Sequence, residues 1–142
     1  MTVHLDDIRS SFAFFDSWED KYRFVIDIGR ELPELPPEHR VAGNIVRGCQ
    51  SQVWLVTELR DGRLRLRIDS DAHIVRGLIV IVLAAYQDRA PADIGAFDIE
   101  ALFDELDLLR HLSPTRGNGL RSMVARIRHE ADRAAALAAA GN

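Results

Sequence analysis

The first thirty residues carry apolar side chains at helical spacing, which predicts two short amphipathic helices. The first covers His4–Phe15. The second follows Ser17, because a serine hydroxyl is a favourable N-cap and Asp20 stands three residues later, as in a capping box. This helix is expected to end at Gly29 or Leu32, where a proline-rich segment begins.

The middle of the chain changes to the alternating pattern of β-strands. Segment 31–40 holds three prolines and is predicted to be an ordered or semi-rigid loop rather than a regular element. An edge strand is expected at Val41–Val46. Apolar and polar residues then alternate over Val53–Leu59. The pair Asp61 and Gly62 follows, which is a strong signal for a tight β-hairpin turn.

The second strand of this hairpin is predicted from an alternation of apolar residues with arginines. Leu64, Leu66 and Ile68 would form its buried face. The arginines between them are Arg63, Arg65 and Arg67. They are most simply explained as the solvated face of the strand, and a docking surface for an acidic partner is the alternative.

A strongly apolar run, Gly77–Tyr86, is predicted to form a buried helix at the centre of the core. Ser70 or Asp71 is expected to cap that helix. The run is much shorter than the roughly 20 residues that a membrane-spanning helix requires. No association with a membrane is therefore expected.

The last third of the sequence predicts further helices. A short helical turn opens at Pro91, a short helix covers Ile99–Leu106, and Ser113 followed by Pro114 begins a long one. The alanine-rich tail 134–142 is expected to continue this helix and to fray. Together these elements predict a single α+β domain, in which helices pack on one face of a small antiparallel sheet.

Composition narrows the class of protein. The chain has 142 residues, of which 47% are hydrophobic and 28% charged, as in a soluble globular domain. Its net charge is −4 and no basic cluster is interleaved with aromatic residues, so nucleic acid is not an expected partner. The acidic start does not resemble a secretory signal, and one cysteine excludes an internal disulfide. A cytoplasmic location is expected.

Cys49 is the one strong nucleophile in the sequence. Arg47 adds positive charge nearby, which favours a thiolate, and Gly48 permits an unusual backbone shape with open access. The residues after the cysteine add polarity without apolar shielding: Gln50, Ser51 and Gln52. The alternative is that Cys49 is an ordinary small residue of the core, since free cysteines are often buried.

The sequence gives little support for metal binding, for Cys-His hydrolysis or for phosphate binding. Five histidines are scattered without metal-binding spacing, and no second cysteine is present to complete a zinc site. A Cys-His hydrolase would need a histidine oriented on Cys49, and no local signature provides one. The glycine-containing stretch Arg116–Arg121 resembles part of a phosphate loop but is placed in or at the start of a helix, where that signature is weak.

Three segments, in this order, resemble the SufE family of cysteine-desulfuration proteins: "RGCQSQVWLV", "DSDAHIVRGLIVIVLAAY" and "HLSPTRGNGLRSMV". The upstream "ELPELP" fits the same pattern. The resemblance runs from about Trp18 to about Ile127 and does not separate SufE from the paralogous CsdE proteins. It implies one SufE-like domain over residues 1–142, with a core at about 18–127 and a fold similar to the IscU cluster scaffold.

The resemblance also implies a function. SufE-like proteins accept sulfur from, and activate, a pyridoxal-phosphate-dependent cysteine desulfurase of the SufS or CsdA type. Cys49 would take that sulfur as a persulfide and pass it to an iron–sulfur scaffold such as SufBCD. The chain would act as a sulfur carrier with no metal or cofactor of its own, since the pyridoxal phosphate belongs to the desulfurase.

Two further positions match the family pattern. Asp71 and Arg116 are implied to steady the cysteine loop and to affect partner docking. Their local alternatives are a helix N-cap and a surface charge near a helix start. A different function also stays open, in which the chain is a binding module that regulates a desulfurase without covalent chemistry. A stand-alone cysteine hydrolase is disfavoured.

Overall fold

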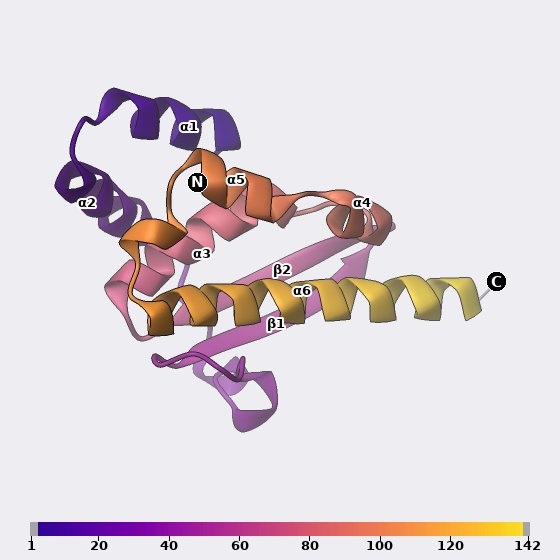
Figure 1. Cartoon of the computed structure of the whole chain (residues 1–142). Coiled ribbons are helices and arrows are strands. Elements are labelled where there is room, and N and C mark those ends of the chain that lie inside the picture. The colour runs from indigo at the N-terminus through magenta and orange to yellow at the C-terminus, as the bar shows by residue number, and fades with distance from the viewer. Residues whose placement is uncertain (1–2, 141–142) are drawn as a thin grey trace.

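In the computed structural model, which describes residues 3–140, the helix that follows a two-stranded antiparallel β-hairpin packs against it, and the two N-terminal helices pack against that helix (Figure 1). The strands are β1 (Val53–Arg60) and β2 (Arg63–Ser70). Asp61 and Gly62 join them, and both have a positive φ. A two-residue hairpin requires this conformation and an Asp-Gly pair adopts it readily. The predicted hairpin is confirmed.

The helices fall on either side of the hairpin in sequence. Two precede it and four follow it: α1 (Leu5–Phe14), α2 (Trp18–Gly29), α3 (His73–Tyr86), α4 (Pro91–Ala96), α5 (Ile99–Glu105) and α6 (Pro114–Ala140). Single 3₁₀ turns occur at Pro37–His39, Ala42–Asn44 and Leu109–His111. The predicted single-domain α+β fold is confirmed. In the described part of the chain, every helix is too short or too polar to traverse a lipid bilayer.

Helix α6 is the longest element, and in the view of Figure 1 it passes in front of the hairpin and projects beyond it. The alanine-rich tail therefore prolongs this helix as far as Ala140. The fraying expected for residues 134–142 stays a prediction, and residues 141–142 lie outside the described part of the chain. Serine caps begin two helices as predicted. The Ser17 Oγ accepts a hydrogen bond from the N–H of Asp20, and the Ser113 Oγ accepts one from the N–H of Arg116.

The predicted alternation in β2 is confirmed. Leu64, Leu66 and Ile68 are buried against the helices, whereas the arginines between them are exposed. Strand β1 departs from simple alternation because Trp54 is buried on the opposite face from Leu55. The loop before β1 covers it there. The first part of the hairpin is therefore enclosed on both sides, and only its distal part has a solvated face.

The expected edge strand at Val41–Val46 is wrong. Residues Ala42–Asn44 form a 3₁₀ turn, because the glycine and asparagine at its centre and end favour turns over strands. Only Ile45 forms an isolated antiparallel bridge with Trp54. The sheet has two strands within the described residues.

The expected cap of α3 is also wrong. The N-cap position is Ala72, which has no side-chain cap. The Ser70 Oγ accepts a hydrogen bond from the N–H of Ala72, before the helix starts. The Asp71 carboxylate instead accepts the N–H of Gln52. The expected buried helix itself is confirmed, since Gly77–Tyr86 forms most of α3 and supplies much of the core.

Helices α2 and α3 cross with their backbones in contact at two glycines. A β-carbon at Gly29 would lie 2.5 Å from the backbone nitrogen of Gly77. A β-carbon at Gly77 would lie 2.6 Å from the Cγ1 atom of Val25. Such distances are far below van der Waals contact, so this approach requires glycine at both positions.

The close crossing lets Arg76 reach from α3 to the end of α2. Its Nε donates a hydrogen bond to the carbonyl oxygen of Gly29 over 3.3 Å, and its guanidinium also donates to the carbonyl oxygen of Leu32. The same guanidinium forms an ion pair with the carboxylate of Asp69, which is fully buried at the end of β2. One arginine therefore joins three elements.

Asp69 is satisfied by several donors. Besides Arg76, its carboxylate accepts hydrogen bonds from the N–H of Leu35 over 2.9 Å and from the guanidinium of Arg40 over 2.9 Å. The Arg40 guanidinium also lies 5.2 Å from the centre of the Trp54 ring. These contacts order the proline-rich loop against the hairpin, so the predicted ordered loop is confirmed.

The glycine crossing predicts a large effect of one methyl group. We expect Gly77→Ala to lower the free energy of unfolding by about 2 kcal/mol or more, because overpacking outweighs the roughly 1 kcal/mol that alanine gains in a helix. Urea denaturation measures this change. Gly43→Ala is the matched control, because a β-carbon there meets nothing within 4 Å. Equal losses in the two variants would contradict the requirement for glycine at the crossing.

Candidate functional site

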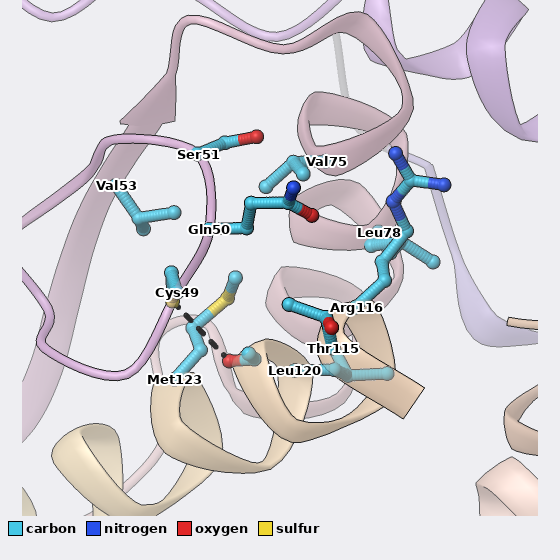
Figure 2. A pocket seen from close by; sticks show the side chains of 11 residues that line it. Cys49, Gln50, Ser51, Val53, Val75, Leu78, Thr115, Arg116, Leu120 and Met123 are labelled. Atoms are coloured by element: carbon cyan, nitrogen blue, oxygen red, sulfur yellow. Dashed lines mark hydrogen bonds between the residues drawn. The ribbon is translucent and has the colours of Figure 1, made fainter. Parts of the chain in front are cut away.

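Cys49 lies in a six-residue loop that is closed at its base. The N–H of Val46 donates to the carbonyl oxygen of Val53 over 2.8 Å, so residues 47–52 form the loop between them. Figure 2 shows the Cys49 side chain directed from this loop toward α6. Its sulfur donates a hydrogen bond to the carbonyl oxygen of Gly119 over 3.4 Å. The thiol is therefore held against a helix at rest.

Gly48 gives the loop the shape that this contact requires. Its φ is +93°, a conformation that side-chain-bearing residues rarely adopt. A β-carbon there would also lie 2.5 Å from the hydroxyl oxygen of Ser122. Both the backbone conformation and the close approach to α6 therefore favour glycine beside the cysteine.

A small cavity of about 20 Å³ adjoins the thiol. This volume is enough for about one water-sized group. Most of its lining is apolar: Val53, Val75, Leu78, Leu120 and Met123. Polar residues complete the lining and include Gln50, Ser51, Thr115 and Arg116 (Figure 2). The sulfur of Cys49 thus borders a space that can enclose one more small group.

Burial raises the pKa of the Cys49 thiol above its ordinary value. Desolvation is the cause, since a thiolate loses more hydration than a thiol when water is excluded. Donation of the S–H to Gly119 favours the neutral thiol in the same direction. In this arrangement the cysteine is mainly protonated at neutral pH, although its side chain is only partly buried.

Asp71 is paired with the last residue of the cysteine loop. Its Oδ1 atom accepts a hydrogen bond from the N–H of Gln52 over 3.1 Å. Its own N–H donates to the carbonyl oxygen of Gln52 over 3.4 Å. The end of β2 therefore holds the loop three residues after Cys49.

The other residues singled out from the sequence lie in two places. Gln50, Ser51 and Arg116 line the cavity with Cys49. In Figure 2 the Arg116 side chain extends away from the cysteine sulfur. Arg47 is exposed on the loop. The structure thus brings most of these residues around one cavity.

Three contributors on α6 were missed as site residues from the sequence alone. Gly119 touches the thiol and Ser122 packs against Gly48. The guanidinium of Arg126 donates to the carbonyl oxygen of Ile45 over 3.2 Å, at the base of the loop. A glycine inside a helix is a signal of close approach, so Gly119 was open to this interpretation. No local sequence pattern identifies Ser122 or Arg126 as part of the site.

The lining of the cavity bears on hydrolytic chemistry. Among the described residues around it there is no histidine. A Cys-His mechanism requires an imidazole within hydrogen-bond reach of the sulfur. The site therefore offers a nucleophile and an enclosed space, without the base that a cysteine hydrolase uses.

Known proteins resemble this chain over nearly its whole length. The family model SufE, described as an Fe-S metabolism associated domain, matches residues 6–131. An uncharacterized SufE-like protein of Rhizobium meliloti is 48% identical over 132 residues, covering 90% of this chain and 94% of the relative. One of Rhizobium etli is 51% identical over 131 residues, covering 89% and 88%.

A solved structure shares the fold. It is the solution structure of a hypothetical protein from Thermus thermophilus, with a TM-score of 0.74. The match covers 92% of this chain and 94% of that chain, at 15% sequence identity. At this identity the likeness concerns the arrangement of helices and strands alone.

The raised pKa predicts slow alkylation of Cys49 near neutral pH. Iodoacetamide reacts with the thiolate, so the rate follows the thiolate fraction. We expect the midpoint of the rate against pH to lie higher in the folded protein than in the same protein unfolded in guanidinium chloride, where the pKa is ordinary. Stopped-flow or mass-spectrometric rates measure both. A midpoint in the folded protein at or below that of the unfolded chain would refute the protected thiol.

The contact between Asp71 and Gln52 predicts that this carboxylate restrains the loop. A hydrogen bond to a charged group contributes about 1.5–3 kcal/mol. We expect Asp71→Ala to speed both the hydrogen exchange of the Gln52 amide and the alkylation of Cys49 by about tenfold. Asp132→Ala is the control, because this exposed carboxylate on α6 makes no ion pair or hydrogen bond within residues 3–140. If Asp71→Ala leaves both the exchange rate of the Gln52 amide and the alkylation rate of Cys49 unchanged, the carboxylate does not restrain the loop.

Proposed function

This chain belongs to the SufE family, and on that basis we propose that Cys49 accepts sulfur from the persulfide of a pyridoxal-phosphate-dependent cysteine desulfurase. The family domain is associated with Fe–S metabolism. The observation that carries the proposal is a single thiol beside an enclosed, mostly apolar space of about one atom group. The pyridoxal phosphate belongs to the desulfurase.

The transfer is a thiol exchange. The Cys49 thiolate attacks the outer sulfur of the partner's cysteine persulfide, and a new sulfur–sulfur bond forms on Cys49. The bond between the partner's two sulfur atoms breaks, and its cysteine leaves as a thiolate. One sulfur atom is transferred from the partner's cysteine to Cys49, and the exchange needs no external oxidant or reductant. The thiol proton of Cys49 must pass to a base at the interface before the attack.

The cavity supports the carrier state. The outer sulfur of a Cys49 persulfide is about the size of the space that adjoins the thiol. Apolar side chains there would exclude water and other thiols, which slows loss of the sulfur. Because Cys49 is the one cysteine of the chain, no internal thiol can displace the sulfur as a disulfide forms.

The rest of the cycle follows from the same chemistry. By taking the sulfur, the chain regenerates the desulfurase and so activates it. The carrier then delivers the sulfur to an iron–sulfur scaffold, for which a SufBCD-type complex is our proposal. Asp71 and Arg116 would steady the loop and contribute to docking. A solitary thiol of this kind fits the reducing cytoplasm, where we place the protein.

Intact-protein mass spectrometry tests the transfer. After incubation with a SufS-type desulfurase and L-cysteine, we expect a gain of one sulfur, about 32 Da, that a reductant removes. Cys49→Ser should show no gain and should no longer stimulate the desulfurase.

A relocated thiol provides the matched control. Ser10 lies on the exposed surface of α1, so Cys49→Ser combined with Ser10→Cys keeps one accessible thiol in a different place. We expect this variant to gain sulfur from the desulfurase much more slowly than the wild type does. Full stimulation of the desulfurase by Cys49→Ser would instead support a regulatory module without covalent chemistry.

A further inference from the structure

Gly119 lies inside α6, the helix against which the thiol is held. A glycine in a helix interior destabilises the helix relative to alanine. At Gly29 and Gly77 a β-carbon would clash with the facing helix, which accounts for those glycines. A β-carbon at Gly119 would instead lie 3.5 Å from the sulfur of Cys49, an ordinary van der Waals contact. The resting thiol alone therefore does not require glycine at position 119.

The missing side chain leaves space beside the sulfur. Gly119 and Cys49 both line the cavity of about 20 Å³, which holds about one water-sized group. A methyl group is of similar size. Alanine at position 119 would place a methyl group against the sulfur and so reduce the room around it. Glycine thus keeps space open next to the thiol for one more atom.

The remaining apolar walls of the cavity are fixed in the core. Leu78 on α3 and both Leu120 and Met123 on α6 line it, and all three side chains are buried. Met123 follows Gly119 by four residues, so both stand on the same face of the helix. Figure 2 shows its side chain extending from α6 toward the cysteine loop. Walls that are packed into a core do not move apart easily, so the cavity does not enlarge freely.

This size matters for a thiol that carries sulfur. Each sulfur atom added to a cysteine lengthens it by one sulfur–sulfur bond of about 2 Å. The first added atom fits a space for one water-sized group, whereas a chain of two needs about twice that space. A second sulfur would therefore lie outside the cavity, within reach of other thiols.

We propose that the cavity limits Cys49 to one transferred sulfur atom, because Gly119 leaves room for the first and Met123 closes the space against a second. The proposal rests on the proposed function of a sulfur carrier and specifies its cargo. Cys49 is protected as a persulfide, and a trisulfide or a longer polysulfide is not. Gly119 and Met123 are thus the residues that determine this specificity.

Inorganic tetrasulfide tests the capacity without a desulfurase. The Cys49 thiolate attacks one sulfur atom of tetrasulfide, a sulfur–sulfur bond forms on Cys49, and trisulfide leaves with the electron pair of the broken bond. After removal of excess reagent, intact-protein mass spectrometry counts the sulfur atoms. We expect a gain of about 32 Da in the wild type, with less than about a tenth of the product at about 64 Da. The variant with Cys49→Ser and Ser10→Cys, whose thiol stands at an exposed position, should show both products in comparable amounts.

Gly119→Ala tests the place for the first sulfur. We expect the variant to fold, because the added carbon makes ordinary contacts. Once loaded, it should lose its sulfur to added glutathione about tenfold faster than the wild type does. Gly117→Ala is the matched control: Gly117 lies on the same helix outside the cavity lining, and a β-carbon there would lie 3.7 Å from the Cδ2 atom of Leu109. Equal rates of loss in the two variants would contradict the role of Gly119.

Met123→Ala tests the wall against the second sulfur. It removes the Cγ, Sδ and Cε atoms, so the share of product at about 64 Da should rise about tenfold. Ile127→Ala is the matched control, because Ile127 is equally buried one turn later on α6 and does not line the cavity. It should leave that share unchanged.

Two results would overturn the proposal. It is wrong if the wild type carries two sulfur atoms as often as the relocated thiol does, or if Met123→Ala gains a second sulfur no more often than Ile127→Ala. The comparison of the wild type with the relocated thiol decides the capacity even if both alanine variants unfold. A wild type that takes one sulfur from tetrasulfide but none from a desulfurase would support the capacity and contradict the proposed function.

Discussion

The buried carboxylate of Asp69 is the interaction on which the arrangement of this protein depends. A charge in the core is tolerable only when donors surround it. Here the donors come from α3 and from the proline-rich loop, while the carboxylate itself stands on β2. Satisfying one anion therefore fixes the relative positions of three parts of the chain. Arg76 can serve it only because the helices beside it meet at glycines.

The arrangement of β2, α3 and the proline-rich loop around Asp69 determines where the cysteine loop can lie. The ordered loop leads to Ile45, which is bridged to Trp54 and bonded to Arg126. Gly119, Ser122 and Arg126 are three and four residues apart, so they share one face of α6. That single face contacts the base, the glycine and the thiol of the loop in succession. A long helix thus serves as a rigid support for a short irregular segment.

The sequence was most informative where the structural signal is local, although the turn residues Gly43 and Asn44 were not given enough weight against an edge strand. Serine caps, the turn at Asp61 and Gly62, and the alternation of β2 each depend on neighbouring residues, and Cys49 was conspicuous as a solitary thiol. The remaining features arise from contacts between distant segments. The donors to Asp69 and the contact of Gly119 with the thiol cannot be read from a local pattern. Asp71 was misassigned as a cap because its carboxylate serves Gln52 on a neighbouring segment.

The closed base of the cysteine loop also limits its reach. Cys49 stands three residues from Val46 and four from Val53, the two anchored ends. An extended chain spans at most about 3.3–3.6 Å per residue, so the thiol can travel only about 10 Å from its anchors. In the proposed transfer, a donor sulfur deep inside another protein is beyond this tether. The donor must therefore present its persulfide near its own surface or on a segment that itself moves outward.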